Sequence, residues 1–157
     1  MTDAQPLSSD EWAFWDTWMQ AQRLLVREVD RVLQADFGIS KAEFSVLVTL
    51  QATPSGEMRV TALAGALDWD KSRVAHLLTR MESRGLLARS ESGAAGRRTG
   101  IALTQPGRDV AERAILEHGR TIRRLAMDRL SLDQRKAISD WSRTLLDDPG
   151  IAAAAAD

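Results

Sequence analysis

Apolar residues recur at intervals of three and four along much of the chain, and capping signals divide this pattern into helices. Ser8 and Glu11 have the spacing of a capping box, which predicts the start of a first helix. Its apolar stripe is formed by Trp12, Trp15, Met19, Val26, Val29 and Leu33. The stripe continues to Phe37 and Gly38, so this helix is unusually long for a small domain.

The same signals predict three more helices before residue 86. Ser40 and Glu43 repeat the capping box, and the helix that they begin should end before Pro54. A compact segment at 61–67 and a helix capped by Asp70 follow, joined by a tight connection. The buried stripe of the later helix is formed by Val74, Leu77, Leu78 and Met81. This arrangement is typical of a helix-turn-helix.

The remaining chain predicts a hairpin and two further helices. Residues 86–92 and 99–103 have the character of strands, with a glycine-rich tip between them. Thr104 begins a helix whose first turn tolerates Pro106, and Ser131 with Gln134 forms a third capping box. We expect the last helix to end at Pro149, and the alanine-rich segment 151–157 to be a disordered tail.

Charge is distributed unevenly along the 157 residues, although the net charge is only −1. Residues 1–70 hold 5 basic and 11 acidic side chains, residues 71–98 hold 7 and 2, and residues 99–157 hold 9 of each. A basic segment between acidic and neutral ones indicates local contact with a polyanion, although a solvated helix face is the alternative for any single run of charge.

Composition excludes several classes of protein. The absence of cysteine rules out disulfides, thiolate metal sites, cysteine nucleophiles and thiol redox switches. The two histidines, His76 and His118, are scattered, and no phosphate-binding glycine loop or HExxH motif is present, so we expect no enzyme, no cofactor and no metal site. No apolar run approaches the length of a membrane-spanning helix, and we expect a cytoplasmic protein.

The order of these elements, with "RMESRGLLAR", "GRRTGIALT" and "PGR" in succession, resembles the MarR family of winged helix-turn-helix transcription regulators. The resemblance implies a mainly α fold with a small β wing and a homodimer joined through its terminal helices. Residues 1–38 and 104–150 would form the dimerisation helices, and residues 39–103 the DNA-binding lobe. The apolar terminal helices independently favour dimerisation, because a small lobe cannot cover them.

The resemblance also implies double-stranded DNA with a pseudo-palindromic operator as the partner. The helix after Asp70 would enter the major groove, and its exposed residues are the candidate contacts. They are Lys71, Ser72, Arg73, His76, Thr79 and Arg80. Arg73 is the first choice for a base contact, since arginine binds guanine through two hydrogen bonds. Lys71, Arg80 and Arg84 suit phosphates.

Two departures from the family pattern affect this assignment. His76 occupies a position where many relatives carry arginine, so the operator is expected to differ. In the wing, Gly96 replaces the usual aspartate, while Arg97 and Arg98 remain. We expect Arg98 to enter the minor groove, which attracts arginine through its negative potential. The alternative is that Arg97 and Arg98 only cover the surface of a solvated loop.

Relatives bind small aromatic acids in a cleft between the dimerisation helices and the lobe, which implies a repressor released by an aromatic or phenolic effector. The residues that would form this cleft are Trp15, Trp18, Gln22, Phe44, Arg113 and His118. Packing of the aromatic residues is the alternative for each of them. A winged-helix module that binds another protein instead of DNA is the alternative function, and steep salt dependence would distinguish DNA binding from it.

Overall fold

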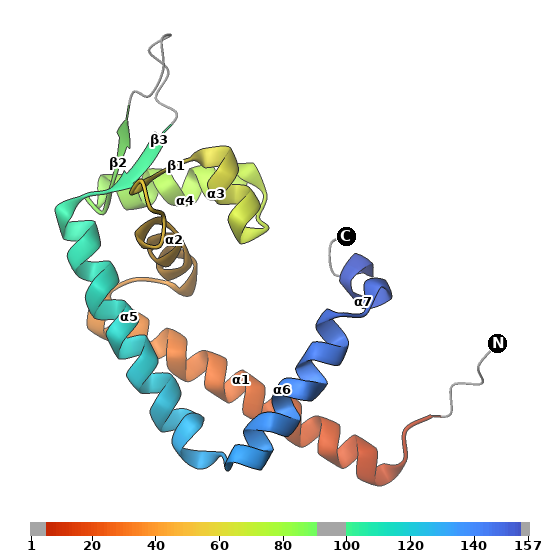
Figure 1. The fold of residues 1–157 in the computed structure, drawn as a ribbon. Helices are drawn as coiled ribbons and strands as arrows, with labels where there is room; N and C mark the ends of the chain where they lie inside the picture. Colours follow the sequence, from red (N-terminus) through yellow and green to blue (C-terminus); the bar gives the residue numbers. More distant parts are fainter. Residues whose placement is uncertain (1–5, 91–99, 155–157) are drawn as a thin grey trace. The chain divides into compact units, whose positions relative to one another are not determined.

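The computed structural model describes residues 6–90 and 100–154, and their secondary structure is mainly helical with a small sheet (Figure 1). The helices are α1 (Ser9–Phe37), α2 (Lys41–Gln51), α3 (Val60–Leu67), α4 (Lys71–Ser83), α5 (Gln105–Leu125), α6 (Leu132–Leu146) and α7 (Pro149–Ala154), with a 3₁₀ turn at Met127–Arg129. The strands are β1 (Glu57–Arg59), β2 (Leu87–Ser90) and β3 (Gly100–Leu103). The prediction of a mainly α fold with a small β wing is therefore confirmed. The chain divides into two compact units, residues 1–121 and 122–157.

The capping boxes predicted from the sequence are confirmed. At the start of α2, the Glu43 amide donates to the Ser40 hydroxyl at 3.2 Å, and the Ser40 amide donates to the Glu43 carboxylate at 2.8 Å. The same reciprocal pair begins α1 at Ser8 and Glu11 and begins α6 at Ser131 and Gln134. These local sequences therefore fix where three helices begin.

The sheet contains one strand more than the hairpin that the sequence predicts. The strand order is β1-β3-β2, and both pairings are antiparallel. Met58 of β1 lies opposite Ile101 of β3, and Ala88 of β2 lies opposite Ala102. Sequence analysis missed β1 because three residues are too short to show an alternating pattern. Its pairing partner also lies about forty residues later in the chain.

The core of the first unit lies mainly within the winged lobe. Side chains from the five helices α1 to α5 and from the sheet meet there, and those exposed by 1% or less include Val46, Leu47, Leu63, Val74, Leu78, Met81 and Ile101. The predicted buried stripe of α4 is thereby confirmed. By contrast, only Val32 and Leu33 of the 29-residue α1 are buried.

The start of α5 is held against the turn that follows α4. A Cβ atom on Gly107 would lie 1.9 Å from the carbonyl oxygen of Leu86, so no larger residue fits without movement of the backbone. The Gly107 amide donates to the Thr104 hydroxyl at 3.0 Å, and Arg108 donates to the carbonyl of Leu103 at 2.7 Å. The "PGR" sequence therefore forms a tight junction between the wing and α5.

In the second unit, α6 begins after Ser131 as predicted, but residues 151–154 differ from the disordered tail that we expected. They belong to α7, whose first amides, at Gly150 and Ile151, donate to the Asp148 carboxylate at 2.8 and 3.1 Å. An aspartate cap followed by proline and alanines favours a helix, which explains the difference. Residues 155–157 lie outside the described residues. No helix in the described part of the chain is long and apolar enough to cross a membrane.

Candidate nucleic-acid interface

The connection between α3 and α4 fixes the first turn of α4. Asp68 adopts a left-handed conformation, with φ of 53°, which ends α3 abruptly. The carboxylate of Asp70 then accepts hydrogen bonds from the hydroxyl and amide of Ser72 and from the amide of Arg73 at 3.2 Å. These donors lower the pKa of Asp70, so the cap remains charged at neutral pH.

One side of α4 faces solvent and carries six of the candidate DNA contacts. All six side chains are exposed, and they are Lys71, Ser72, Arg73, His76, Thr79 and Arg80. The opposite side, with Val74 and Leu78 among others, is buried in the core. The structure therefore brings these candidates together on one accessible surface of the helix-turn-helix.

The guanidinium of Arg73 lies over the indole ring of Trp69, with its central carbon 4.8 Å from the ring centroid. Trp69 is half-buried and packs against the core, so its indole ring is held in place beneath the Arg73 guanidinium. Sequence analysis did not identify this stack. Trp69 lies directly before the N-cap Asp70 and Arg73 lies in the first turn of α4, so the stack depends on the conformation of the turn.

Arg89 of β2 connects the wing to α4. Its Nε donates to Glu82 at 3.0 Å, and its Nη2 donates to the hydroxyl oxygen of Thr79 at 3.2 Å. The Thr79 hydroxyl in turn donates its proton to the carbonyl of Ala75 at 3.0 Å. Thr79 is therefore already engaged within the protein, and Arg89 is a further residue of this surface that the sequence did not identify.

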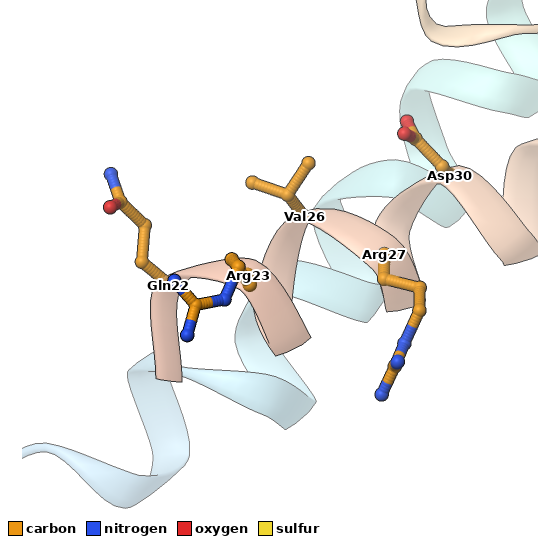
Figure 2. A pocket seen from close by; sticks show the side chains of 5 residues that line it. All are labelled: Gln22, Arg23, Val26, Arg27 and Asp30. Atoms are coloured by element: carbon orange, nitrogen blue, oxygen red, sulfur yellow. The ribbon is translucent and has the colours of Figure 1, made fainter. Parts of the chain in front are cut away.

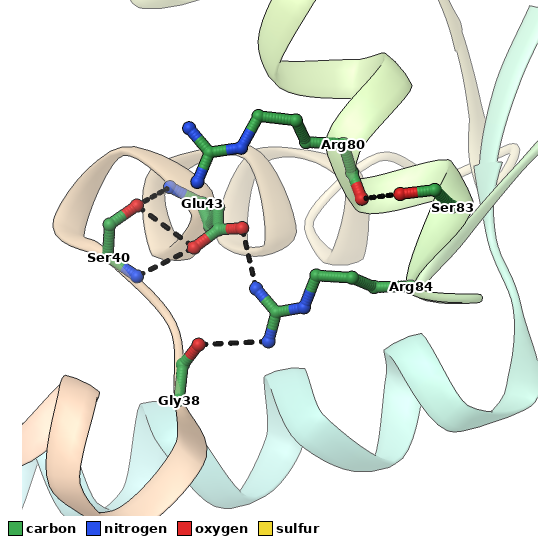
Figure 3. Close-up of polar contacts among 6 residues, drawn as sticks. All are labelled: Gly38, Ser40, Glu43, Arg80, Ser83 and Arg84. Atoms are coloured by element: carbon green, nitrogen blue, oxygen red, sulfur yellow. Dashed lines mark hydrogen bonds and ion pairs between the residues drawn. The ribbon is translucent and has the colours of Figure 1, made fainter.

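Arg84 makes two contacts inside the protein (Figure 3). Its Nη1 lies 2.7 Å from Oε1 of Glu43, and its Nη2 donates to the carbonyl oxygen of Gly38 at 2.9 Å. Burial of Glu43 alone would raise its pKa, but the hydrogen bonds from Ser40 and the charge of Arg84 hold this pKa below its usual value. Contact of Arg84 with a phosphate stays a prediction. Gly96, Arg97 and Arg98 lie outside the described residues, and so does the prediction that concerns them.

Two of the six predicted effector residues meet in the structure. The ring centroids of Phe44 and His118 are 4.6 Å apart, and Phe44 is buried in the core. Nδ1 of His118 is buried and has no hydrogen-bond partner among the described residues. Burial and the nearby positive charge of Lys41 lower the pKa of His118, so its ring is neutral at pH 7.

The other predicted effector residues are spread over separate places. Gln22 lines a shallow pocket of about 380 Å³ on α1, together with Arg23, Val26, Arg27 and Asp30 (Figure 2). Arg113 lies over the ring of Phe37 at 5.7 Å and lines a second depression of about 330 Å³. Trp15 is 43% exposed on α1, and Trp18 is half-buried there. The structure thus does not gather the six residues into one site.

Residues 39–98 of the chain match the sequence profile of the MarR family. This segment contains α2, β1, the helix-turn-helix and the candidate contacts on α4. A search of curated proteins finds no match to the chain. Among the described residues, no group of three or more acidic or histidine side chains is placed to hold a metal ion.

Solved structures of similar fold cover nearly the whole chain. AbsC, a MarR family transcriptional regulator from Streptomyces coelicolor, is 26% identical with a TM-score of 0.80, and the match covers 92% of this chain and 97% of AbsC. Sco3205, a MarR family regulator from the same organism solved in complex with DNA, is 28% identical with a TM-score of 0.80, covering 94% and 92%. The organohalide-sensing regulator RdhR-CbdbA1625, solved with 2,4-dichlorophenol, shares the fold at 19% identity and a TM-score of 0.73, covering 94% and 88%.

Proposed function

We propose that this chain, whose residues 39–98 match the MarR family and whose fold is similar to those of MarR family transcriptional regulators, binds a pseudo-palindromic DNA operator as a homodimer and acts there as a repressor. The observation that carries this proposal is the exposed side of α4, where basic and polar side chains project from a helix whose other side is buried in the lobe. A helix so placed presents its outer residues to the major groove. Binding to chromosomal DNA would place the protein in the cytoplasm.

Within this surface, Arg73 is proposed to read a base and Lys71 and Arg80 to contact phosphates. Arg73 stands at the third position of α4, close to the end that enters the groove, and its stack on Trp69 limits its orientations. A guanidinium whose orientation is already restricted before DNA binds loses less conformational entropy when it pairs with guanine. The wing residues Arg97 and Arg98 are proposed to contact the adjacent minor groove.

The dimer is proposed to form through the terminal helices, with 1–38 and 104–150 as its dimerisation segments. Apolar side chains on α1 are unusually exposed for a single chain, since Trp12 and Phe14 are 53% and 69% exposed. In the second unit, Trp141 and Leu146 are 43% and 77% exposed. Exposed apolar groups of this size favour burial against another surface, and a second copy offers one in a symmetric assembly.

A small aromatic or phenolic acid is proposed as the effector that releases DNA. The depression beside Phe37 and Arg113 is also lined by Asp36, Glu117 and Arg120, and its ring and two cations would hold a planar anion whose carboxylate lies toward the arginines. RdhR-CbdbA1625 was solved with a phenol bound, which supports this class of ligand. The probe is salicylate, which should raise the melting temperature saturably and lower affinity for DNA. Arg113→Gln should weaken both effects, and absence of both in the unaltered protein would refute the effector.

DNA binding itself is tested by selection of duplexes from a randomised library, followed by affinity measurements at several salt concentrations. We expect one enriched palindromic sequence and a steep linear fall of log K with log salt, because phosphate contacts release counterions. Failure to enrich any sequence would contradict the proposal. Salt-insensitive capture of a protein instead would favour the winged-helix interaction module.

A further inference from the structure

Three helix ends meet at one guanidinium. Arg84 is the residue that ends α4, Gly38 is the left-handed residue that ends α1, and Glu43 belongs to the capping box that begins α2. Figure 3 shows Arg84 between the other two, with one nitrogen directed to the Glu43 carboxylate and another to the Gly38 carbonyl. The contact joins residues 41 and 46 positions apart in the sequence.

We propose that Arg84 is a positioning residue that fixes the direction of α4 relative to α1, and thereby the spacing of operator half-sites that the dimer accepts. The proposal rests on the proposed function, because it requires a dimer joined through α1. A dimer holds its two recognition helices at a distance set by the route from the dimer interface to each α4. In this chain the Arg84 contact is a direct polar link along that route.

Loss of the contact between Arg84 and Glu43 is costly because the Glu43 side chain is almost fully buried. Its side chain is 3% exposed, whereas that of Arg84 is 40% exposed. A buried carboxylate that loses its cation keeps the cost of burial without the attraction that offsets it. Glu43 therefore favours only those orientations of α4 in which Arg84 reaches it.

The two acceptors also define a direction and not merely a distance. Arginine offers several donors in a rigid plane, so Nη1 and Nη2 can bind two different acceptors at once. Movement of α4 that keeps one contact breaks the other. The apolar contacts of Leu78 and Met81 in the core are not directional, whereas this planar pair favours one orientation of α4.

The test compares operators that differ only in the spacing of their half-sites. The probe is the palindromic duplex selected by the unaltered protein, together with versions whose centre is one base pair shorter or longer. One base pair turns a half-site by roughly 34° about the DNA axis. The variants are Arg84→Gln and Glu43→Gln, of which the second supplies an amide oxygen that can still accept the hydrogen bond of the Ser40 amide in the capping box. Arg80→Gln is the matched control, because it removes an exposed arginine one turn earlier on α4.

We expect the unaltered protein to prefer its selected spacing by about tenfold, a difference of about 1.4 kcal/mol. Arg84→Gln and Glu43→Gln should both reduce this preference severalfold while the salt dependence stays unchanged. Arg80→Gln should keep the spacing preference and lower the salt slope by about 1.8, because each dimer would then neutralise two fewer phosphates.

Three results would overturn the proposal. If Arg84→Gln lowers the salt slope and Glu43→Gln has no effect, Arg84 is a phosphate contact. If both variants weaken all three duplexes equally, the pair only stabilises the fold. Should Arg84→Gln fail to fold, Arg84→Lys keeps the charge but has one nitrogen for two acceptors, and an unchanged spacing preference in that variant would equally refute the role. Failure of the unaltered protein to bind any duplex would refute the proposed function instead.

Discussion

The winged lobe and α1 belong to the same unit of the chain but bury their apolar residues very differently. In the lobe, each main helix and the sheet contribute side chains such as Val46, Leu63 and Ile101 that are exposed by 1% or less. In α1, which is more than twice as long as α4, Val32 and Leu33 are the only buried residues, and both lie near its end. The N-terminal half of α1 extends beyond the helices and strands of the lobe (Figure 1).

The difference indicates that the core is completed around the lobe, with Leu33 of α1 and Ala111 and Ala114 of α5 as contributors, whereas most apolar side chains of α1 stay exposed and would be covered in the proposed dimer. Burial of apolar surface contributes about 25 cal/mol per Å². The exposed apolar side chains of α1 would therefore supply substantial free energy for association if a second surface covered them. The lobe then needs only to present its polar outer side to DNA. Substitutions in the two regions should therefore affect different properties. Those in α1 should change association between chains, and those in and beside the lobe should change folding stability or DNA recognition.

The largest effect is expected from Val26→Asp in α1, a position that is 43% exposed. If this stripe forms the dimer interface, the change removes apolar burial and introduces a charge in both copies, weakening dimerisation by about 3 kcal/mol or more. Sedimentation equilibrium measures the loss. Gln20→Asp, elsewhere on the same helix, should leave the dimer intact, and an equal effect of both changes would contradict the assigned face.

The next effect is on folding stability, at the junction between the wing and α5. Gly107→Ala places a methyl group against the carbonyl of Leu86 and should destabilise the protein by about 2 to 3 kcal/mol through overpacking. Denaturant unfolding measures this free energy. Gly119→Ala is the matched control on α5, because no atom lies within 4 Å of its added Cβ. The control should be stabilised by up to about 1 kcal/mol. Similar losses for both would show that the close contact is unimportant.

A comparable or smaller effect is expected in DNA recognition. Arg73→Ala should cost about 1 to 3 kcal/mol of binding and relax the preference at one base position in each half-site. Binding selections with a randomised operator check this result. Lys71→Ala, an exposed neighbour, should weaken all sequences uniformly. Unchanged base preferences in the Arg73 variant would assign the reading of that base to another residue.

The smallest effect concerns the pH dependence of stability. The pKa of His118 is lowered in the folded state, so the unfolded state binds more protons below pH 6.5. This contribution to stability is complete above pH 6.5 and is lost as the pH falls through the lowered pKa. His118→Gln should flatten the unfolding profile in this range. A profile unchanged by His118→Gln would show that this ring does not cause the dependence.

Local signals predicted much of this fold. The caps at Ser8, Ser40 and Asp70 each involve residues two or three positions apart, so the sequence alone contains both partners. The short strand β1 was missed because its pairing with β3 is distant in sequence. The short helix α7 was missed because an alanine-rich end has no apolar stripe to indicate packing.

The same contrast between local signals and contacts distant in sequence applies to the candidate interface. The exposed positions of α4 follow from its helical period, and the structure places them on one side as expected. The contact of Arg84 with Glu43 and that of Arg89 with Thr79 depend on how separate elements meet. No spacing in the sequence indicates such pairs. Sequence reasoning therefore identified the exposed surface of α4 but not the contacts that position this helix.

The most direct test of the account is the composition of the complex with DNA. Native mass spectrometry of the protein with its selected palindromic duplex should give two copies of the chain per duplex, and Val26→Asp should reduce this complex while leaving the lobe folded. Two copies are expected because, in the proposed dimer, each lobe reads one half-site and α1 joins the two lobes. One copy per duplex at saturation, or no complex with any selected sequence, would contradict the account.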